Sequence, residues 1–383
     1  MSEINLPTGW TQVKFGDVAK QIKTKVDPET SDLERYIAGG HMDTDDLKLR
    51  RWGTIGDGYL GPAFHRMFKK GQILYGSRRT YLRKVAVADF DGVCANTTFV
   101  IEAKAERIHP PLLPFIMQSE PFVEHSIKNS RGSTNPYVNW KDIAKYEFPL
   151  PPLDEQRRIA GILWAVEEVI ESQILLKNKL EKIMRLMRYH CFSQDWREES
   201  LENLFHVQLG KMLSKKARQG KSPKPYLANA NVQWNYIDLS EVRQMDFDDK
   251  EFKKFKLEVG DILVCEGGEV GRSAIWEGQI ENCCYQKALH RLRNKNNELH
   301  TKLMLHFMNY ANRKGYFAAL TGHSTIAHLT MVKLKKLKVP VPPPNVQLHM
   351  LNIFNQLEIT TKVALDKLEK TFKLKKSLLE QLL

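Results

Sequence analysis

Basic side chains gather in a few loop-like segments of this sequence, and these residues are the best candidates for chemistry. Arg78, Arg79, Arg83 and Lys84 crowd the segment after Gly76. Farther along, a short loop combines the guanidinium of Arg131 with the hydroxyls of Ser133 and Thr134. Lysine and arginine neutralise phosphates, and arginine also forms bidentate hydrogen bonds to guanine edges. The residue types therefore indicate contact with a nucleic acid.

A matching set of polar residues follows in the second half of the chain. A stretch rich in Gly, Ser and Pro, without one acidic residue, carries Lys211, Lys215, Lys216, Arg218, Lys221 and Lys224. Arg272, Lys287, His323 and Ser324 fall where the second half matches the loops of the first. For any one of these residues the alternative is a solvated surface charge. As a set, in loops at matching places of two halves, they predict DNA contact.

Signals for catalysis are weaker. Asp91, Glu102 and Lys104 fit the D…E-x-K pattern of nucleases, in which carboxylates hold Mg²⁺ and a lysine assists the attacking water. Glu251 and Lys253 also fit E-x-K, which shows how common this spacing is. A free-standing Mg-dependent nuclease is therefore kept only as an alternative.

Two further motifs lack essential parts. Residues 135–137, Asn-Pro-Tyr, resemble the Asn-Pro-Pro-Tyr motif that holds a flipped base in amino-methyltransferases, but the second proline is missing and no glycine-rich S-adenosylmethionine segment precedes them. The glycines of residues 267–271 are not followed by the Lys-Ser/Thr ending of a phosphate loop, so a turn is the better interpretation. The five cysteines form no C-x-x-C pair, which argues against a zinc site. The sequence therefore predicts no catalytic residue, no metal site and no cofactor on this chain.

Composition and charge fit a globular protein with a polyanionic partner. The 383 residues carry a formal net charge of +13, with 42% hydrophobic and 27% charged residues. Such an excess of positive charge favours nucleic acid or a membrane surface as partner. No stretch approaches the roughly 18 consecutive apolar residues of a membrane span, and residues 1–10 do not resemble a signal peptide. We therefore expect a cytoplasmic protein with reduced thiols and no membrane partner.

An internal repeat organises the chain. Trp10 recurs as Trp196, Gly71 as Gly260, Ser133 as Ser324 and Gln156 as Gln347, so the offset drifts only from 186 (196 − 10) to 191 (347 − 156). Each match is weak alone, but four matches in one order predict a duplicated unit of about half the chain. Short apolar runs punctuated by glycine, such as residues 85–88, 99–101 and 262–265, indicate strands, and residues 112–118 and 303–310 indicate short helices. Each unit therefore begins with an α+β (α/β-like) globule.

A long helix closes each unit. Prolines end the strand that precedes each helix, and Asp154 and Asn345 are the expected N-caps. Apolar residues then recur every three or four positions, as in a coiled-coil seam. The predicted seam consists of Ile159, Leu163, Val166, Ile170, the polar Gln173, Leu176, Leu180, Ile183 and Met187 in the first helix and Met350, Phe354, Leu357, Thr361, Ala364 (opposite Gln173), Leu368, Leu374, Leu378 and Leu382 in the second. We expect the two helices to pack on each other as an antiparallel coiled coil; the alternative is that each packs on its own globule.

The residues above resemble the specificity subunits of type I restriction-modification systems. The segments that carry the resemblance are residues 6–10, 71–77 and above all 149–160, where a proline stop, Glu-Gln and a heptad helix follow one another. The second unit departs from this pattern at residues 344–347, where its helix start matches less closely. The resemblance covers the whole chain and implies target-recognition domains at residues 1–153 and 192–343, with spacer helices at 154–191 and 344–383, in a pseudo-twofold arrangement.

The family resemblance also implies partners and a division of labour. Each recognition domain would read one half of a bipartite, asymmetric target in double-stranded DNA. The helices would space the domains and dock two methyltransferase subunits, with restriction and translocase subunits beyond them. S-adenosylmethionine, ATP and Mg²⁺ are expected on those partners and not on this chain. The remaining alternative is a structural coiled-coil adaptor that does not bind DNA.

Overall fold

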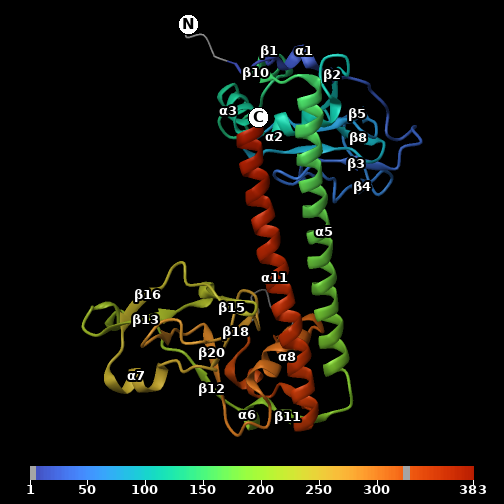
Figure 1. The fold of residues 1–383 in the computed structure, drawn as a ribbon. Helices are drawn as coiled ribbons and strands as arrows, with labels where there is room; N and C mark the ends of the chain where they lie inside the picture. The colour runs from blue at the N-terminus through green and yellow to red at the C-terminus, as the bar shows by residue number, and fades with distance from the viewer. Residues whose placement is uncertain (1–5, 322–327) are drawn as a thin grey trace. The chain divides into compact units, whose positions relative to one another are not determined.

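Residues 6–321 and 328–383 are described by the structure, a computed structural model (Figure 1). The chain divides into two compact units: unit 1 contains the residues up to 174 together with 366–383, and unit 2 contains residues 175–365. Both units combine short, mostly antiparallel strands with helices, so the predicted α+β class is confirmed. None of the helices in the described ranges is both long and apolar enough to cross a lipid bilayer.

Unit 1 is built on two four-stranded sheets. One has the order β2-β9-β6-β7 and the other the order β4-β3-β8-β5, while a separate antiparallel pair joins β1 to β10. The strands are β1 (Thr11–Lys14), β2 (Ala19–Ile22), β3 (Arg35–Ile37), β4 (Gly53–Thr54), β5 (Phe64–Phe68), β6 (Ile73–Gly76), β7 (Val85–Val87), β8 (Gly92–Ala95), β9 (Thr98–Ala103) and β10 (Glu147–Leu150). The helices are α1 (Phe15–Val18), η1 (Gly39–His41), η2 (Thr80–Leu82), η3 (Pro110–Leu112), α2 (Leu113–Gln118), α3 (Glu120–Lys128) and α4 (Trp140–Ile143).

Unit 2 repeats this plan. Its four-stranded sheet has the order β12-β20-β17-β18, its second sheet the order β16-β13-β19, and β11 pairs with β21 as β1 does with β10. The strands are β11 (Arg197–Ser200), β12 (Phe205–Leu209), β13 (Pro223–Leu227), β14 (Val232–Gln233), β15 (Tyr236–Ile237), β16 (Arg243–Asp246), β17 (Ile262–Cys265), β18 (Ser273–Ile275), β19 (Cys284–Tyr285), β20 (Leu289–Asn294) and β21 (Lys338–Val341). The helices are α6 (Leu201–Leu204), η4 (Lys216–Arg218), η5 (Asn229–Asn231), α7 (Asp249–Phe255), α8 (Thr301–Arg313), α9 (Tyr316–Thr321) and α10 (Met331–Lys335).

The duplication extends to strand order and to strand direction. The order β2-β9-β6-β7 corresponds strand for strand to β12-β20-β17-β18, and every pairing in both sheets is antiparallel. In the second sheet of each unit one parallel pair occurs, between β3 and β8 and between β13 and β19. The predicted repeat is therefore a repeat of topology and not only of a few sequence motifs.

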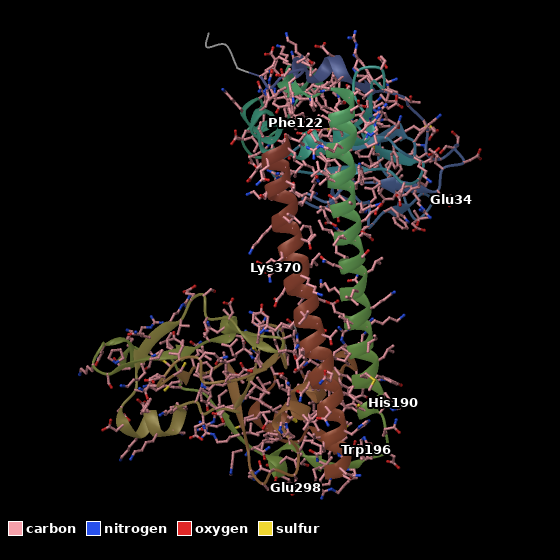
Figure 2. All side chains as sticks on the ribbon, viewed as in Figure 1. Glu34, Phe122, His190, Trp196, Glu298 and Lys370 are labelled. Carbon is pink, nitrogen blue, oxygen red and sulfur yellow. The ribbon has the colours of Figure 1, made fainter. Side chains whose placement is uncertain are left out.

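In each of these two corresponding four-stranded sheets, one inner strand is buried on both faces, which explains why its sequence is apolar throughout. In β6, Ile73 and Tyr75 enter one hydrophobic core while Leu74 enters another. In β17, Ile262 and Val264 likewise face one core and Leu263 another. Successive side chains of a strand point to opposite faces, so a sheet covered on both faces requires a continuous apolar run. Figure 2 draws the side chains on the ribbon and labels Phe122, which is fully buried in the core of unit 1.

Two long helices, α5 (Leu153–Phe192) and α11 (Pro344–Leu382), contribute one segment each to both units. In unit 1 the start of α5 lies against the end of α11, since Ile159 and Leu163 share a core with Leu379. In unit 2 the end of α5 lies against the start of α11, where the Phe192 and Phe354 rings stack with centroids 6.5 Å apart. The paired segments therefore run antiparallel within each unit, as predicted.

Both helices begin two residues earlier than the predicted N-caps imply. Asp154 and Asn345 were predicted as N-caps, but the helices begin at Leu153 and Pro344, so both residues lie inside the first turn. Proline is well suited to the first helical position because its fixed φ matches the helix and its missing N–H is not needed there. An acid such as Asp154 inside the first turn interacts favourably with the helix dipole.

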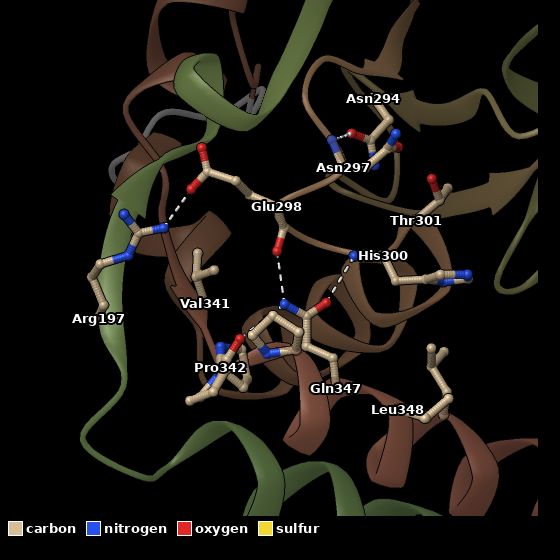
Figure 3. Close-up of a pocket in the computed structure, with 13 residues that line it drawn as sticks. Arg197, Asn294, Asn297, Glu298, His300, Thr301, Val341, Pro342, Gln347 and Leu348 are labelled. Atoms are coloured by element: carbon tan, nitrogen blue, oxygen red, sulfur yellow. Dashed lines mark hydrogen bonds and ion pairs between the residues drawn. The ribbon is translucent and has the colours of Figure 1, made fainter.

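A glutamine at the start of each long helix ties the helix to its unit. Gln347 accepts a hydrogen bond from the His300 backbone N–H (3.0 Å) and donates to the carbonyl oxygens of Glu298 and Pro342, as Figure 3 shows. Gln156 makes equivalent bonds in unit 1, accepting from the His109 N–H (2.7 Å) and donating to the Pro151 carbonyl (2.8 Å). Both glutamines are buried. The glutamine of the Glu-Gln signature, which recurs in the second unit without the glutamate, therefore has a structural role.

Polar groups also join α5, α8 and α11 in unit 2. The fully buried His306 ring stacks on Phe354 (3.9 Å between centroids), and its Nδ1 accepts a hydrogen bond from Arg188 Nε (3.2 Å). Its Nε2 lies 3.3 Å from a Glu358 oxygen. Burial, aided by the Arg188 and Lys302 cations, lowers the pKa of His306 well below its ordinary value of 6.5. Burial also lowers the pKa of His290, which is likewise fully buried.

These two histidines predict that the protein loses stability as the pH falls below 6.5. The unfolded chain then binds protons that the folded chain does not, so the free energy of unfolding decreases by up to about 1.4 kcal/mol per pH unit for each histidine. Urea unfolding at pH 7.5, 6.5 and 5.5 measures the slope. The His306→Phe variant should give a shallower slope, and an unchanged slope would show that His306 does not titrate as expected.

Candidate nucleic-acid interface

Residues more than fifty positions apart meet in one loop cluster of unit 1. After β6 ends at Gly76, the Arg79 backbone N–H donates to the carbonyl of Pro136 (2.6 Å), and Ser77 accepts from the N–H of Val138 (2.9 Å). Arg131 and Tyr137 exchange backbone hydrogen bonds across the same loop. We define the unit 1 basic surface as the exposed residues Arg78, Arg79, Arg131, Ser133 and Thr134. The structure thus brings together two of the sequence-predicted groups.

The guanidiniums of this surface are oriented but remain accessible. Arg79 Nε donates to the Asn135 side-chain oxygen (3.2 Å), and Arg131 Nη2 lies 3.7 Å from an Asp142 oxygen while its side chain stays 57% exposed. Arg79 has a φ of +50°, a left-handed conformation that is uncommon for a residue with a side chain and is often found at functional sites. Asn135, whose incomplete Asn-Pro-Tyr motif was not taken as a base-binding site, helps to orient an arginine.

Arg83 and Lys84 are used inside unit 1. Arg83 donates to Asp45 (2.8 Å) and to Glu120 (2.7 Å), and these carboxylates raise its pKa despite burial, which alone lowers it. The Lys84 ammonium donates to the Gly39 carbonyl. Because Arg83 and Lys84 are both bonded to groups within unit 1, we leave them out of the proposed interface.

The basic stretch of unit 2 wraps around a buried carboxylate. The Ser222 N–H donates to Asp246 Oδ1 (2.7 Å), and the Phe247 N–H donates to the Ser222 carbonyl (3.0 Å). Although burial alone raises it, backbone N–H groups from Ser222 and the preceding residues hold the pKa of the Asp246 carboxyl below its ordinary value. We define the unit 2 basic surface as the exposed residues Lys215, Arg218, Lys221 and Lys287.

The other unit 2 residues that were predicted to contact DNA either interact with groups of the unit itself or have side chains that the structure does not describe. The Lys211 ammonium lies 2.5 Å from a Glu251 oxygen and is only 11% exposed, while Arg272 donates to the Asn229 carbonyl (2.9 Å). The half-buried Lys224 lies over the Phe252 ring. His323 and Ser324 lie outside the described residues, and the side chain of Lys216 is not described either. Base or phosphate contact for the remaining residues stays a prediction.

Two exposed aromatic residues beside the unit 1 basic surface were not predicted from the sequence to contact DNA. Tyr81 is 52% exposed and Tyr137 is 42% exposed, and both belong to the segments that form this surface. Tyrosine can stack on a base or donate its hydroxyl to a phosphate. In the sequence Tyr81 lies close to Arg78 and Arg79, and Tyr137 lies close to Arg131. This alternation of aromatic and basic residues could have indicated a nucleic-acid contact.

The candidate catalytic residues of unit 1 are committed to structural bonds. Asp91 accepts from the Lys70 N–H (2.8 Å), Glu102 pairs with Lys20 (2.9 Å) and Gln72 (2.6 Å), and Lys104 donates to the Gly16 carbonyl (2.8 Å). Within residues 6–321 and 328–383, no group of three or more His, Cys, Asp or Glu could hold a metal ion. All five cysteines are buried, and burial raises the pKa of each thiol. These positions therefore give no support to the nuclease alternative.

Comparison with known protein families reveals the same duplication. A family model described as the type I restriction modification DNA specificity domain matches residues 7–182 and again residues 193–382. The chain belongs to this family. Both the predicted repeat and the resemblance to type I specificity subunits are thereby confirmed. The family is one of DNA specificity and not of catalysis, so neither the nuclease nor the adaptor alternative gains support.

Two curated members of the type I specificity family are similar over part of their length. The EcoDI specificity subunit of Escherichia coli is 30% identical over 189 residues, which cover 48% of this chain and 40% of that protein. The HindI specificity subunit of Haemophilus influenzae is 23% identical over 243 residues, covering 61% of this chain and 52% of that protein. The matches thus span about half the length of these relatives.

Solved structures of type I systems share the fold over the whole chain. One, from work on complex assembly and conformational transition of a type I R-M system, superposes with a TM-score of 0.63 at 19% identity, covering 99% of this chain and 98% of that chain. The type I S subunit from M. genitalium gives a TM-score of 0.60 at 17% identity, with 100% and 97% coverage. At these identities the likeness establishes the fold.

Lys215 and Lys221 of the unit 2 basic surface are expected to contact DNA phosphates. Replacing Lys215 and Lys221 by Ala should weaken binding to every DNA sequence alike and reduce the slope of log K against log salt by roughly 0.9 for each lost phosphate contact. Binding of fluorescent duplexes at several salt concentrations measures both effects. The matched control exchanges the exposed Lys362 and Lys367 of α11 for Ala and should leave the slope unchanged. Equal slopes in all three proteins would remove these residues from the interface.

Proposed function

We propose that this chain is the DNA-reading subunit of a type I restriction-modification complex and contributes no catalytic group. One observation carries the proposal: a single fold topology occurs twice, within a family of DNA specificity domains, but with unlike basic surfaces. The unit 1 basic surface is rich in arginine and hydroxyls, whereas that of unit 2 is rich in lysine. Each unit reads one part of a bipartite target, and because the surfaces differ, the two parts differ in sequence.

The long helices act as the spacer and as the docking site for two methyltransferase subunits. At 1.5 Å per residue, a helix of the length of α5 extends about 60 Å. Many apolar side chains on both helices remain exposed, which is typical of surfaces that bind a protein partner. They include Val169, Leu175, Leu176, Ile183 and Leu186 on α5, and Ile359, Val363, Leu365, Phe372 and Leu374 on α11.

Catalysis belongs to the partners in this proposal. The methyltransferase subunits bind S-adenosylmethionine and modify the DNA that this chain has located, and restriction and translocase subunits use ATP and Mg²⁺. The complex works in the cytoplasm, where its DNA substrate lies. The engagement of Asp91, Glu102 and Lys104 in structural bonds supports this division.

A domain exchange tests the proposal. Replacing residues 11–152 by the corresponding segment of another family member should change one half of the methylated motif and leave the other half unchanged. Because Ile159, Leu163 and Leu379 pack in the core of unit 1, residues 153–174 and 366–383 should be exchanged together with that segment. Genome-wide mapping of methylated adenines, after co-expression with the methyltransferase subunit, reads the result. An unchanged motif, or a change in both halves, would contradict the assignment of one half-site to each unit.

A further inference from the structure

A small cationic pocket in unit 2 lies outside both basic surfaces. It has a volume of about 300 Å³ and is lined by Arg185, Arg188, Tyr189, Tyr310, Arg313 and Lys314. The first three belong to the end of α5, and the others belong to the end of α8 and the turn that follows it. Four of the six lining residues carry a positive charge, and none carries a negative charge.

Arg188 is the deepest cation of this pocket and is held by neutral acceptors. Its Nε donates to His306 Nδ1 (3.2 Å) and its Nη1 donates to the Asn309 side-chain oxygen (3.3 Å). A guanidinium has five N–H donors, so three remain for a ligand. Burial, with a contribution from Arg313, lowers the pKa of Arg188 to about 10, so it stays protonated at neutral pH. A half-buried charge without an ionic partner is costly, and a bound anion would remove that cost.

The positive charge of the pocket is not neutralised by nearby acids. Within the described residues, no carboxylate lies within ion-pair distance of Arg185, Arg188, Arg313 or Lys314. Glu358, the acid that acts on Arg188, is itself paired with Lys302 at 2.6 Å. The Lys314 ammonium lies over the Tyr189 ring, 4.4 Å from its centroid, so the two sides of the pocket are in contact.

The duplicated fold does not require a cation at this position. With the offset of 191 that relates Gln156 to Gln347, Arg188 of α5 corresponds to Leu379 of α11. Leu379 packs in the apolar core of unit 1 beside Ile159 and Leu163. Unit 2 thus has an arginine that lines a pocket where unit 1 has a leucine packed in an apolar core.

We propose that this pocket binds the phosphate group of a nucleotide. A guanidinium with three available N–H groups suits the bidentate recognition of phosphate oxygens, and the neighbouring cations supply further charge-assisted bonds. The tyrosine rings give the volume beyond one phosphate an aromatic wall, against which the rest of a nucleotide can lie. The phosphate comes either from a DNA backbone or from a free nucleotide.

Calorimetric titration of the full chain with sodium tripolyphosphate, at constant ionic strength, tests the site. The wild-type chain should bind, and the R313Q/K314Q variant should bind at least about tenfold more weakly. Both exchanged residues are exposed, so this variant should fold, and R188Q provides a second variant with the same expected loss. The K362Q/K367Q control removes two exposed charges of α11 and should bind like the wild type. Absence of binding to the wild type, or equal affinity in the R313Q/K314Q variant, overturns the proposal.

Competition then identifies the source of the phosphate. A mixed-sequence DNA duplex that displaces tripolyphosphate from the wild-type pocket assigns the site to the DNA backbone, and lack of displacement assigns it to a free nucleotide. The pocket does not depend on the proposed reading of DNA, because a chain that fails to discriminate DNA sequences can still bind tripolyphosphate. The two proposals can therefore fail separately.

Discussion

Replacing Lys375 by Met is expected to lower the free energy of unfolding by about 3–5 kcal/mol, because it leaves a buried carboxylate without its partner. Lys375 of α11 and Glu167 of α5 form an ion pair of 2.5 Å in unit 1, with side chains only 5% and 6% exposed. The lysine also donates to the Asp45 backbone carbonyl (3.1 Å), so it joins both helices to the globule. Urea unfolding of the full chain at neutral pH measures the loss.

Two further variants show whether the loss arises from the unpaired charge. The double variant K375M/E167L replaces the pair by apolar side chains and should recover most of the stability, because a well-packed apolar pair often equals a buried ion pair. The control K373M removes a lysine that is 74% exposed and pairs with Glu369 one turn away, and it should cost less than about 0.5 kcal/mol. If K375M unfolded like K373M, the pair would not be buried in solution.

The same pair shows what apolar periodicity could and could not predict in the helices. Ile159, Leu163 and Ile170 were predicted in the seam and are buried. Leu176, Ile183 and Leu374 were also placed there but are 45%, 43% and 51% exposed. A contact between two helices covers only a narrow stripe, and the spacing of apolar residues does not tell which of two adjacent stripes is covered. A pattern of apolar residues also could not reveal that Glu167 and Lys375 occupy seam positions.

Strand existence was easier to predict than strand pairing. Residues 262–265 were predicted as a strand and form β17 with the same bounds. The sheet order was not predicted, because β2 pairs with β9, so that Ile22 lies opposite Val100, far along the chain. Local patterns reflect which face of a strand is buried, whereas pairing depends on long-range packing. The repeat nevertheless predicted that both units would share one order.

The candidate interface was likewise only partly predictable from the sequence. The positive character of Arg78, Arg79, Arg83 and Lys84 was visible in the sequence, but their availability was not. Arg83 is engaged because the chain brings Asp45 and Glu120 to it, and Lys211 is engaged because Glu251 approaches it from α7. A carboxylate distant in the sequence therefore decides whether a cation can reach DNA, and only the tertiary structure reveals it.

The double variant R79A/R131A should abolish discrimination at one half of the target. Both guanidiniums are exposed on one loop cluster, oriented by Asn135 and Asp142. A bidentate arginine–guanine contact contributes about 1–3 kcal/mol of discrimination, so each single variant should reduce the preference for the correct base roughly 5- to 150-fold. Because both residues bond to the same 131–137 loop, their effects should not be additive. Competition between the target and duplexes with one changed base, measured with the assembled methyltransferase, gives the preference at each position.

The pattern of loss distinguishes base reading from simple charge attraction. If the unit 1 basic surface reads bases, R79A/R131A reduces discrimination at positions of one half-site only, whereas the other half-site keeps its preference. The K215A/K221A variant of unit 2 provides the contrast, since loss of phosphate contacts weakens all sequences in proportion and leaves the ratio between them unchanged. An R79A/R131A variant that behaved like K215A/K221A would show that the two arginines contact only the DNA backbone. Base recognition by unit 1 would then have to be sought among Tyr81, Tyr137 and the hydroxyls of Ser133 and Thr134.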